Sequence, residues 1–266
     1  MDLTVIGAGA AYPDRPGTAS SAYLVELGGA RLLLDMGQGA FAGLAGRTEP
    51  ADLLAVVISH LHPDHFVDLV ALRHYLRYEW QPPRRVRVLA PTGLTARLDG
   101  LAGEPGFAAA TLDVERRTEG HLTLGPFALE SRLVAHTDES YAIRIAPAAD
   151  PAAAGLVYSG DCGLGPDLAQ LVRAGDTLLV EVAFGPGPVP AGALHLDAPA
   201  AGALAAATRP ARVLLTHLQM RRDPGATLAA VRARYDGPVT LVRDGDRFVV
   251  GENESRGPDV PGPGSA

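Results

Sequence analysis

The run Ser59-His60-Leu61-His62-Pro63-Asp64-His65 places three imidazoles and one carboxylate within six residues, directly after an apolar segment. Neutral imidazoles bind Zn²⁺, Fe²⁺ or Mn²⁺, and a carboxylate in the same loop adds charge for a second ion. The alternative is a polar turn at a helix start, with Pro63 in the first turn and Asp64 favoured by the helix dipole. That alternative does not explain three histidines in a chain that has eight. The run therefore predicts a two-metal hydrolase.

The pattern His-x-His-x-Asp-His resembles the signature motif of the metallo-β-lactamase superfamily, in which further ligands follow in a fixed order. The matching positions are His136 after an apolar run, Asp161 in a Gly-Asp turn, and His217 after the run Val213-Leu-Leu-Thr. The resemblance implies one ion on His60, His62 and His136, a second on Asp64, His65 and His217, and Asp161 between the two.

Each of the later positions has an ordinary explanation when it is taken singly. His136 or His217 would be a strand-end histidine, and Asp161 would be a turn residue before Gly163. Their common order, each just after a short β-like run, favours the ligand interpretation.

The resemblance narrows to the ribonuclease Z branch and covers nearly the whole chain from Leu3 to Val250. Its marks are the segments 3–9, 20–25 and 33–39, and a histidine, His195, before an alanine-rich helix. The sequence is most similar to the compact actinobacterial cyclic-nucleotide phosphodiesterases of this branch, through His136-x-x-Glu139-Ser140 followed by an aromatic residue, and through Leu194-His195-Leu196.

Two departures from the ribonuclease Z pattern bear on function. Ribonuclease Z carries a long basic arm that clamps tRNA, whereas here only 24 residues with one arginine separate His136 from Asp161. The branch also places a glutamate shortly after its catalytic histidine, whereas this chain reads His195-Leu-Asp197-Ala-Pro. Either Asp197 or a residue distant in the sequence would then position His195.

The resemblance implies a dinuclear metal-dependent phosphodiesterase that hydrolyses 3′,5′-cyclic nucleotides such as cyclic AMP. A hydroxide held between two divalent ions, Zn²⁺ or else Mn²⁺ or Fe²⁺, would attack phosphorus, and Asp64 or Asp161 would orient it. His195 would protonate the departing oxygen as a general acid, although a histidine before a helix can also act as a local cap. Ser140 is a candidate donor to the substrate phosphate.

Other functions remain open at this stage. A tRNA 3′-processing endonuclease would need a basic surface elsewhere in the chain or on a partner subunit. A metallo-hydrolase of carboxylic esters, thioesters or lactones would use the same metal-bound hydroxide, which would attack a carbonyl carbon instead of phosphorus. A metal-binding scaffold without turnover is the third alternative.

Composition and charge limit the function classes further. The chain has 266 residues, 47% of them hydrophobic, which is enough for a sizeable core in one domain. A single cysteine, Cys162, excludes an internal disulfide, and the absence of a leader or of ~18 consecutive apolar residues predicts a cytoplasmic protein without a membrane span. The net charge of −7 argues against a strong nucleic-acid-binding surface but permits a small anionic phosphodiester as substrate. The resemblance implies a possible homodimer.

Alternation of apolar and polar residues predicts two β-rich halves, each covered by helices. The expected strands are 3–7, 22–27, 31–35, 55–59, 86–90, 127–135, 140–145, 155–159, 177–182, 212–216, 238–241 and 248–250, and the expected helices are 40–45, 64–77, 165–173, 198–207 and 224–235. This is the α/β class, a four-layer αββα metallo-β-lactamase sandwich with the ligands on loops along one edge. We expect one hydrolase domain over residues 1–251 and a disordered tail over residues 252–266, where apolar residues are too few to bury.

Overall fold

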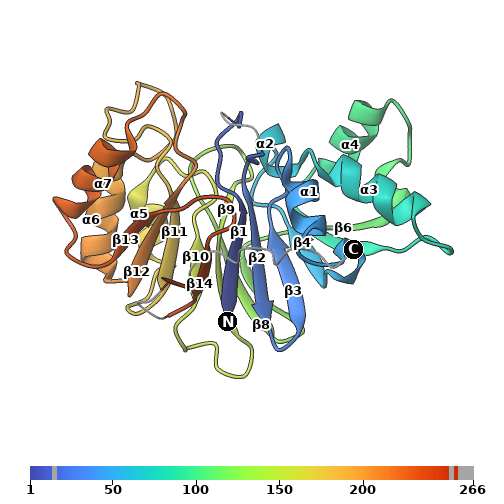
Figure 1. Cartoon of the computed structure of the whole chain (residues 1–266), viewed down its shortest axis with the longest axis horizontal. Helices are drawn as coiled ribbons and strands as arrows, with labels where there is room; N and C mark the ends of the chain where they lie inside the picture. Colours follow the sequence, from blue (N-terminus) through green and yellow to red (C-terminus); the bar gives the residue numbers. More distant parts are fainter. Residues whose placement is uncertain (14–16, 252–254, 257–266) are drawn as a thin grey trace, which may run out of the picture.

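Runs of β-branched and leucine residues form the strands of two stacked sheets (Figure 1). The computed structural model describes residues 1–13, 17–251 and 255–256. The first sheet has the strand order β15-β14-β1-β2-β3-β4-β5-β6. Its strands are β1 (Asp2–Gly7), β2 (Ala22–Leu27), β3 (Ala30–Leu34), β4 (Ala55–Val57), β5 (Val86–Ala90), β6 (Leu112–Arg116), β14 (Arg247–Val249) and β15 (Ser255–Arg256).

The second sheet is built from the later part of the chain and has the order β13-β12-β11-β10-β9-β8-β7. Its strands are β7 (Gly120–Leu124), β8 (Phe127–Leu133), β9 (Tyr141–Pro147), β10 (Leu156–Tyr158), β11 (Thr177–Glu181), β12 (Arg212–Thr216) and β13 (Val239–Leu241). Strands β10, β11, β12 and β13 are parallel neighbours, so their carboxyl ends lie at one edge of the sheet.

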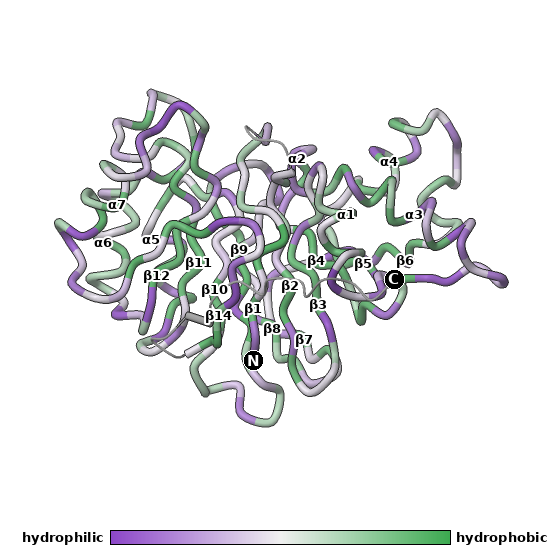
Figure 2. The backbone as a smooth tube through the Cα atoms, viewed as in Figure 1, coloured by the Kyte–Doolittle hydropathy of each residue, from purple (hydrophilic) through white to green (hydrophobic). Residues whose placement is uncertain are grey.

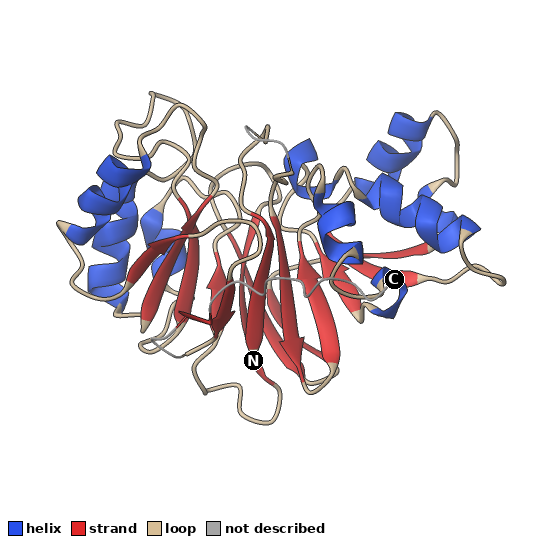
Figure 3. Cartoon of the chain, in the orientation of Figure 1, coloured by secondary structure: helices blue, strands red, loops and turns tan. Residues whose placement is uncertain are grey.

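Helices cover the outer face of each sheet, which gives four layers (Figure 3). The α-helices are α1 (Ala40–Ala45), α2 (Pro63–Phe66), α3 (Leu69–Tyr78), α4 (Leu94–Ala102), α5 (Gly165–Ala169), α6 (Ala198–Thr208) and α7 (Pro224–Arg232), with short 3₁₀ turns at Pro50–Asp52 and Ala108–Ala110. In Figure 1, α5, α6 and α7 lie beside the second sheet, and α1, α3 and α4 beside the first. The predicted αββα sandwich is confirmed.

Three hydrophobic clusters hold these layers together, and hydrophobic segments follow the strands in Figure 2. In β3, Leu32 and Leu34 face the second sheet in the central cluster, whereas Leu33 faces the helices, because side chains alternate across a strand. Leu32, Leu33 and Leu34 are all fully buried. Such two-sided burial explains why the inner strands read as continuous apolar runs.

Most predicted elements lie within two residues of the observed ones, but the single helix expected over residues 64–77 is wrong. The chain forms two helices, α2 and α3, with a break at Val67 and Asp68. Met36 causes the break, because its backbone N–H donates to the carbonyl of His65 at 2.7 Å and its carbonyl accepts from the N–H of Asp68 at 3.1 Å. The break separates α2, which carries Asp64 and His65, from α3, which lies beside the first sheet.

Three elements between residues 91 and 126 were not predicted, namely α4, β6 and β7. Strands β6 and β7 are edge strands, and most of their side chains are half-buried or exposed. They therefore lack the apolar alternation by which inner strands are recognised.

The predicted domain over residues 1–251 stays a prediction. Of the predicted disordered tail, Ser255–Arg256 pair with β14, and the remainder lies outside the described residues. Within residues 1–13, 17–251 and 255–256, none of the helices is long and apolar enough to cross a membrane.

Candidate metal centre

The predicted ligands come together at one edge of the sandwich, in the loops that follow strand ends. The loop after β4 carries His60, His62, Asp64 and His65, and Pro63 begins α2 so that Asp64 and His65 lie in its single turn. The second sheet delivers the other three, which are His136 after β8, Asp161 after β10 and His217 after β12. Parallel β10 and β12 flank β11, so the Asp161 and His217 loops approach each other.

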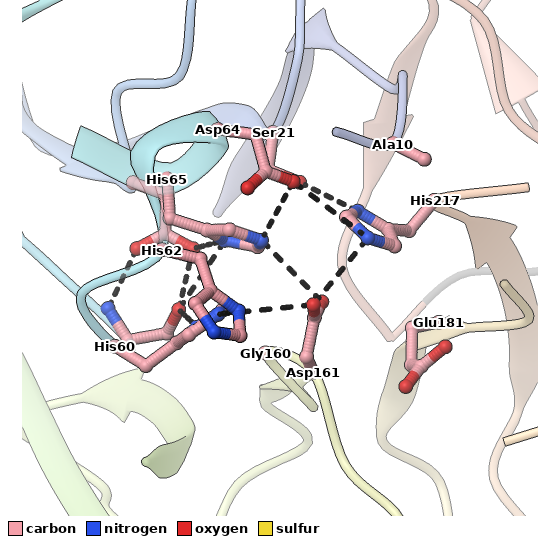
Figure 4. Close-up of polar contacts among 12 residues, drawn as sticks. Ala10, Ser21, His60, His62, Asp64, His65, Gly160, Asp161, Glu181 and His217 are labelled. Carbon is pink, nitrogen blue, oxygen red and sulfur yellow. Dashed lines mark hydrogen bonds and ion pairs between the residues drawn. The ribbon is translucent and has the colours of Figure 1, made fainter. Parts of the chain in front are cut away.

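The first group of side chains consists of His60, His62, His136 and Asp161. Figure 4 labels His60, His62 and Asp161 of this group. His62 Nδ1 lies 3.0 Å from Nε2 of His60 and 3.0 Å from Nε2 of His136. Asp161 Oδ2 lies 3.7 Å from Nε2 of His60 and 3.6 Å from Nε2 of His136. Three imidazoles and one carboxylate therefore converge on a single point.

The second group consists of Asp64, His65 and His217, again with Asp161 alongside (Figure 4). Asp64 Oδ2 is 3.5 Å from Nε2 of His65 and 3.8 Å from Nε2 of His217. Asp161 reaches this group with both oxygens, Oδ1 at 3.4 Å from Nε2 of His65 and Oδ2 at 3.4 Å from Nε2 of His217. Its carboxylate thus lies between the two groups.

Two buried polar atoms in these groups have no hydrogen-bond partner among the described residues, namely His65 Nε2 and Asp161 Oδ1. Leaving such atoms unpaired is costly unless something binds them. The donor set, imidazole with carboxylate, is the one that Zn²⁺ and other first-row divalent ions take. The residues present therefore fit divalent metal ions.

Electrostatics favour the ligand forms of most of these side chains. Burial, followed by neighbouring imidazoles, lowers the pKa of His60, His62 and His136, which keeps them neutral. Burial would raise the pKa of Asp64, but the nearby His65, followed by His217, holds it below its usual value. Burial opposes the charged form of His65 as well, yet Asp161 and Asp35 raise its pKa, so binding of a metal there must displace a proton.

Each ligand imidazole except His62 has its other ring nitrogen in a hydrogen bond. His65 Nδ1–H donates to Asp35 Oδ2 at 2.7 Å, and His136 Nδ1–H donates to the carbonyl of Leu194 at 2.6 Å. The remaining pairs are His60 Nδ1 with Ser59 Oγ at 3.1 Å and His217 Nδ1 with Ser21 Oγ at 3.2 Å. Such partners fix ring orientation and tautomer at metal sites.

Asp35 is a buried partner of the candidate site that the sequence analysis missed. It is fully buried and also accepts from the Ser59 N–H at 2.6 Å, the Ser59 hydroxyl at 2.7 Å and the Tyr158 hydroxyl at 2.7 Å. The φ angle of 56° places it in the left-handed region, which aspartate tolerates better than most residues. One signal was present, a carboxylate at the end of the apolar run before Met36, but nothing local connects it to His65.

His195 lies beside the cluster and is positioned by a residue from another strand. Its Nδ1–H donates to Oε1 of Glu181 at 2.8 Å, and Glu181 is the last residue of β11. The nearby Asp197 instead accepts from the Ala200 N–H at 2.9 Å as the N-cap of α6. The positioning group is therefore the distant Glu181, which the sequence did not identify.

Glu181 is almost fully buried and is held by three further backbone donors, the N–H groups of Cys162 at 3.0 Å, Ala183 at 2.9 Å and Leu196 at 3.2 Å. Burial lowers the pKa of His195, but the hydrogen bond and charge of Glu181 outweigh it, so the pKa of His195 lies above its usual value. Because Nδ1 is occupied, Nε2 is the ring nitrogen that can exchange a proton with a substrate.

Ser140 is placed differently from its predicted role as a donor to substrate. It is 1% exposed, and its hydroxyl accepts from the Thr137 N–H at 3.1 Å and contacts the Thr137 hydroxyl at 2.7 Å. This geometry favours a structural role within the loop that carries His136. The neighbouring Glu139 fastens the same loop to the first half by accepting from Thr92 N–H at 2.7 Å and from Arg116 at 2.8 Å.

A pocket of about 100 Å³ opens beside the two groups. Its lining residues are Ala10, Ala11, Tyr12, His62, Asp64, Asp161, Ala183, His195, His217 and Gln219. The carboxylates of Asp64 and Asp161 therefore line the same small pocket as the candidate acid His195. A reacting group would lie between the two carboxylates.

The fold and this cluster define a metallo-hydrolase. Residues 30–218 match the model of the family described as Beta-lactamase superfamily domain, and the chain belongs to that superfamily. It is 33% identical over 255 residues to an uncharacterized protein of Mycobacterium leprae, a match that covers 92% of this chain and 87% of the relative.

Two named relatives place the chain within the superfamily. It is 30% identical to ribonuclease Z of Pyrobaculum calidifontis, covering 69% of this chain and 74% of that protein. The crystal structure of the metallo-β-lactamase fold protein YhfI from Bacillus subtilis superimposes with a TM-score of 0.81 at 23% identity, covering 93% of this chain and 98% of that one. The resemblance to the superfamily and its ribonuclease Z-like group is confirmed, and the similarity to cyclic-nucleotide phosphodiesterases stays a prediction.

Proposed function

We propose that the protein is a dinuclear metal-dependent phosphodiesterase that hydrolyses 3′,5′-cyclic nucleotides, cyclic AMP in particular, to nucleoside monophosphates. The observation that carries the proposal is the His195–Glu181 pair, 2.8 Å apart, at the rim of the His/Asp cluster. An alkoxide such as a ribose oxygen is a poor leaving group and needs a proton, which a histidine oriented in this way can donate.

The ligand assignment follows the two groups of side chains. One ion would be held by His60, His62 and His136, a second by Asp64, His65 and His217, and Asp161 would contact both. Divalent ions at such a site supply Lewis acidity and lower the pKa of bound water toward neutrality. Zn²⁺ is the proposed ion, and Mn²⁺ or Fe²⁺ suits the same donors.

The chain's own residues orient the reactants and move the proton. Asp64 and Asp161 remain ionised, because neighbouring histidines lower the pKa of both carboxyl groups despite burial. Either carboxylate can accept a hydrogen bond from the attacking water and so align its lone pair with phosphorus. The new P–O bond forms to that water, whose proton passes to the carboxylate, while the P–O3′ bond breaks and His195 Nε2–H transfers its proton to the ribose oxygen.

The segment between His136 and Asp161 weighs against a tRNA substrate. It contains β9 and β10, and its single arginine, Arg144, is 3% exposed and donates to Asp176 at 2.8 Å from both Nε and Nη2. A buried, paired guanidinium cannot neutralise tRNA phosphates. The net charge of −7 points the same way.

The tRNA 3′-processing endonuclease remains the second candidate because of the 30% identity to an archaeal ribonuclease Z. Hydrolysis of a carboxylic ester, thioester or lactone would use the same ligands, and an alkoxide leaving group of an ester or lactone would also take a proton from His195, so a substrate test must separate this candidate. A non-catalytic scaffold would need neither His195 nor the adjoining pocket.

A substrate panel tests the proposal. Metal-loaded protein is given cyclic AMP, bis(p-nitrophenyl) phosphate, a precursor tRNA and p-nitrophenyl acetate, in parallel with His62→Ala and with His121→Ala, a matched change at an exposed histidine of β7. We expect nucleoside monophosphate from cyclic AMP, abolished in His62→Ala and kept in His121→Ala. Cleavage of the tRNA or the ester alone would replace the proposed function with the corresponding alternative.

Three further expectations from the sequence are part of this proposal and rest on no structural observation. They are a small phosphodiester as the binding partner, a homodimer in solution and a cytoplasmic location. Light scattering measures the second directly, and a monomeric mass would remove the homodimer from the account.

A further inference from the structure

Part of the pocket lining consists of small residues, one primary amide and one aromatic ring. Ala10, Ala11 and Tyr12 come from the segment after β1, and Ala183 and Gln219 come from the ends of β11 and β12. The alanines leave room beside the reacting centre. Tyr12 stands at the edge of this space with 53% of its surface exposed.

The backbone that carries Tyr12 is fastened on both sides. Asp244 accepts from the N–H groups of Ala8 at 2.9 Å and Ala19 at 2.7 Å, so one carboxylate holds the segments that precede and follow the loop. The carbonyl of Ala10 accepts from the Ser20 hydroxyl at 2.8 Å. The carbonyl of Ala8 accepts from the N–H of His217 at 3.0 Å, which ties this segment directly to a metal ligand.

Gln219 is fixed at its backbone and free at its side chain. Its N–H donates to the carbonyl of Ala183 at 3.3 Å, and its carbonyl accepts from the N–H of Arg222 at 2.9 Å. Among the residues that the structure describes, no hydrogen bond engages the Gln219 amide or the Tyr12 hydroxyl. A primary amide on a pinned backbone and an exposed ring thus face the same pocket without internal partners.

We propose that Tyr12 and Gln219 form a nucleobase subsite, in which the Tyr12 ring stacks on the base and the Gln219 amide pairs with its edge. The inference rests on the proposed function for the reacting group, a phosphate ester held at the cluster. An exposed aromatic ring in the lining of the pocket beside the cluster matches a substrate with a flat ring at a short distance from its phosphate. Stacking on aromatic side chains accepts any base.

The amide adds a preference among bases. A glutamine amide offers one donor and one acceptor side by side, which matches the N7 acceptor and N6 donor of adenine, whereas guanine presents two acceptors on the same edge. The subsite therefore favours adenine over guanine. A sugar phosphate without a base would have no ring to stack on Tyr12 and no edge to pair with Gln219.

Equilibrium binding tests the subsite independently of turnover. Calorimetric titration of the metal-loaded protein with AMP, GMP and ribose 5-phosphate gives three dissociation constants for wild type, Tyr12→Ala, Tyr12→Phe and Gln219→Ala. Tyr78→Ala is the matched control, because Tyr78 is 63% exposed on α3, away from the pocket lining. We expect wild type to bind AMP about 5- to 100-fold more tightly than ribose 5-phosphate, the range that stacking contributes.

In Tyr12→Ala this ratio should fall several-fold, to what the Gln219 contact alone contributes, while Tyr12→Phe and Tyr78→Ala should keep it, since the ring and not the hydroxyl provides the stacking. Gln219→Ala should lose the preference for AMP over GMP. Equal binding of AMP and ribose 5-phosphate by wild type, no binding of either, or an unchanged ratio in Tyr12→Ala would each overturn the inference.

Hydrolysis of cyclic AMP, measured in the same variants, separates this inference from the proposed function. A protein that prefers AMP through Tyr12 but hydrolyses no cyclic nucleotide would retain the subsite and lose the proposed function. Hydrolysis of cyclic AMP with the same kcat/KM in wild type and Tyr12→Ala would retain the function and remove the subsite.

Discussion

Asp35 Oδ2 lies 2.7 Å from Nδ1 of His65, across 30 residues of sequence that lead from the end of β3 to α2. The same carboxylate accepts from Ser59, the residue that begins the metal loop. Asp35 therefore orients the ligand His65 and holds the start of the loop with a single side chain. Partners of this kind fix the ring orientation and tautomer of a metal-binding histidine.

Replacing Asp35 by asparagine should weaken metal binding by about 10- to 100-fold, because the His65 tautomer is no longer held by a charged acceptor. Asparagine keeps the side-chain size and tolerates the φ of 56°. Metal affinity measured by competition with a chromophoric chelator checks this. Asp113→Asn, an exposed change in a pair with Arg85, is the control, and equal affinities in the two variants would remove the role given to Asp35.

The effect on kcat of removing the general acid should depend on the leaving group of the substrate. His195→Ala should lower kcat for cyclic AMP by about 10²- to 10⁴-fold, the usual contribution of general acid catalysis. With bis(p-nitrophenyl) phosphate, whose leaving group needs no proton, kcat should change far less. Steady-state kinetics on both substrates measures the contrast, and equal losses on the two would exclude proton donation by His195.

Glu181→Gln should move the alkaline limb of the pH profile. Glu181 raises the pKa of His195, and the acid is active while protonated, so activity is present below that pKa and is lost as the pH rises through it. Without the negative charge the pKa of His195 falls, and the limb should shift to lower pH. A profile of kcat for cyclic AMP against pH gives the shift, and an unmoved limb would show that Glu181 does not act through His195.

Substitutions at two glycines distinguish the effect of close packing from the effect of helix propensity. A Cβ at Gly37 would clash with the carbonyl oxygen of Asp64, so Gly37→Ala must displace the loop that carries the candidate ligands. A Cβ at Gly100, in α4, meets nothing within 4 Å. We expect Gly37→Ala to lose metal content and stability, and Gly100→Ala to gain about 0.5–1 kcal/mol. Chemical denaturation with metal analysis measures both, and a metal-replete Gly37→Ala of normal stability would contradict the packing described.

Metal removal should lower the thermal midpoint. A ligand at a free concentration 100-fold above its dissociation constant adds about 2.7 kcal/mol of stability. Chelation also leaves His65 Nε2 and Asp161 Oδ1 buried without partners. Differential scanning calorimetry before and after dialysis against a chelator tests this, with Zn²⁺ added back as the control. An unchanged midpoint would mean that the cluster binds no metal tightly.

The candidate ligands and the layer order could both be predicted from the sequence, the run at residues 60–65 through its spacing and the later positions through the resemblance to a family. Ligand spacing within residues 60–65 is a direct chemical requirement, and inner strands such as β3 and β12 are continuous apolar runs. Edge strands β6 and β7 carry no such signal, since neither of their faces is well buried.

Contacts between distant segments could not be predicted in the same way. Glu181 is joined to His195 only because β11 ends where the loop before α6 passes, and Asp197, the nearer carboxylate, was the obvious candidate. The break between α2 and α3 depends on the backbone of Met36, which is 29 positions before His65. Each of these features is tertiary, so local propensity does not contain it.

The most direct test is a metal titration followed by product formation. Metal-free protein receives increasing equivalents of Zn²⁺ while bound metal and AMP released from cyclic AMP are measured together, with His62→Ala in parallel. The account predicts AMP formation that rises with bound metal, levels off at two ions per chain, and is absent from His62→Ala. Cyclic AMP hydrolysis by the metal-free protein, or no AMP at full metal occupancy, would contradict it.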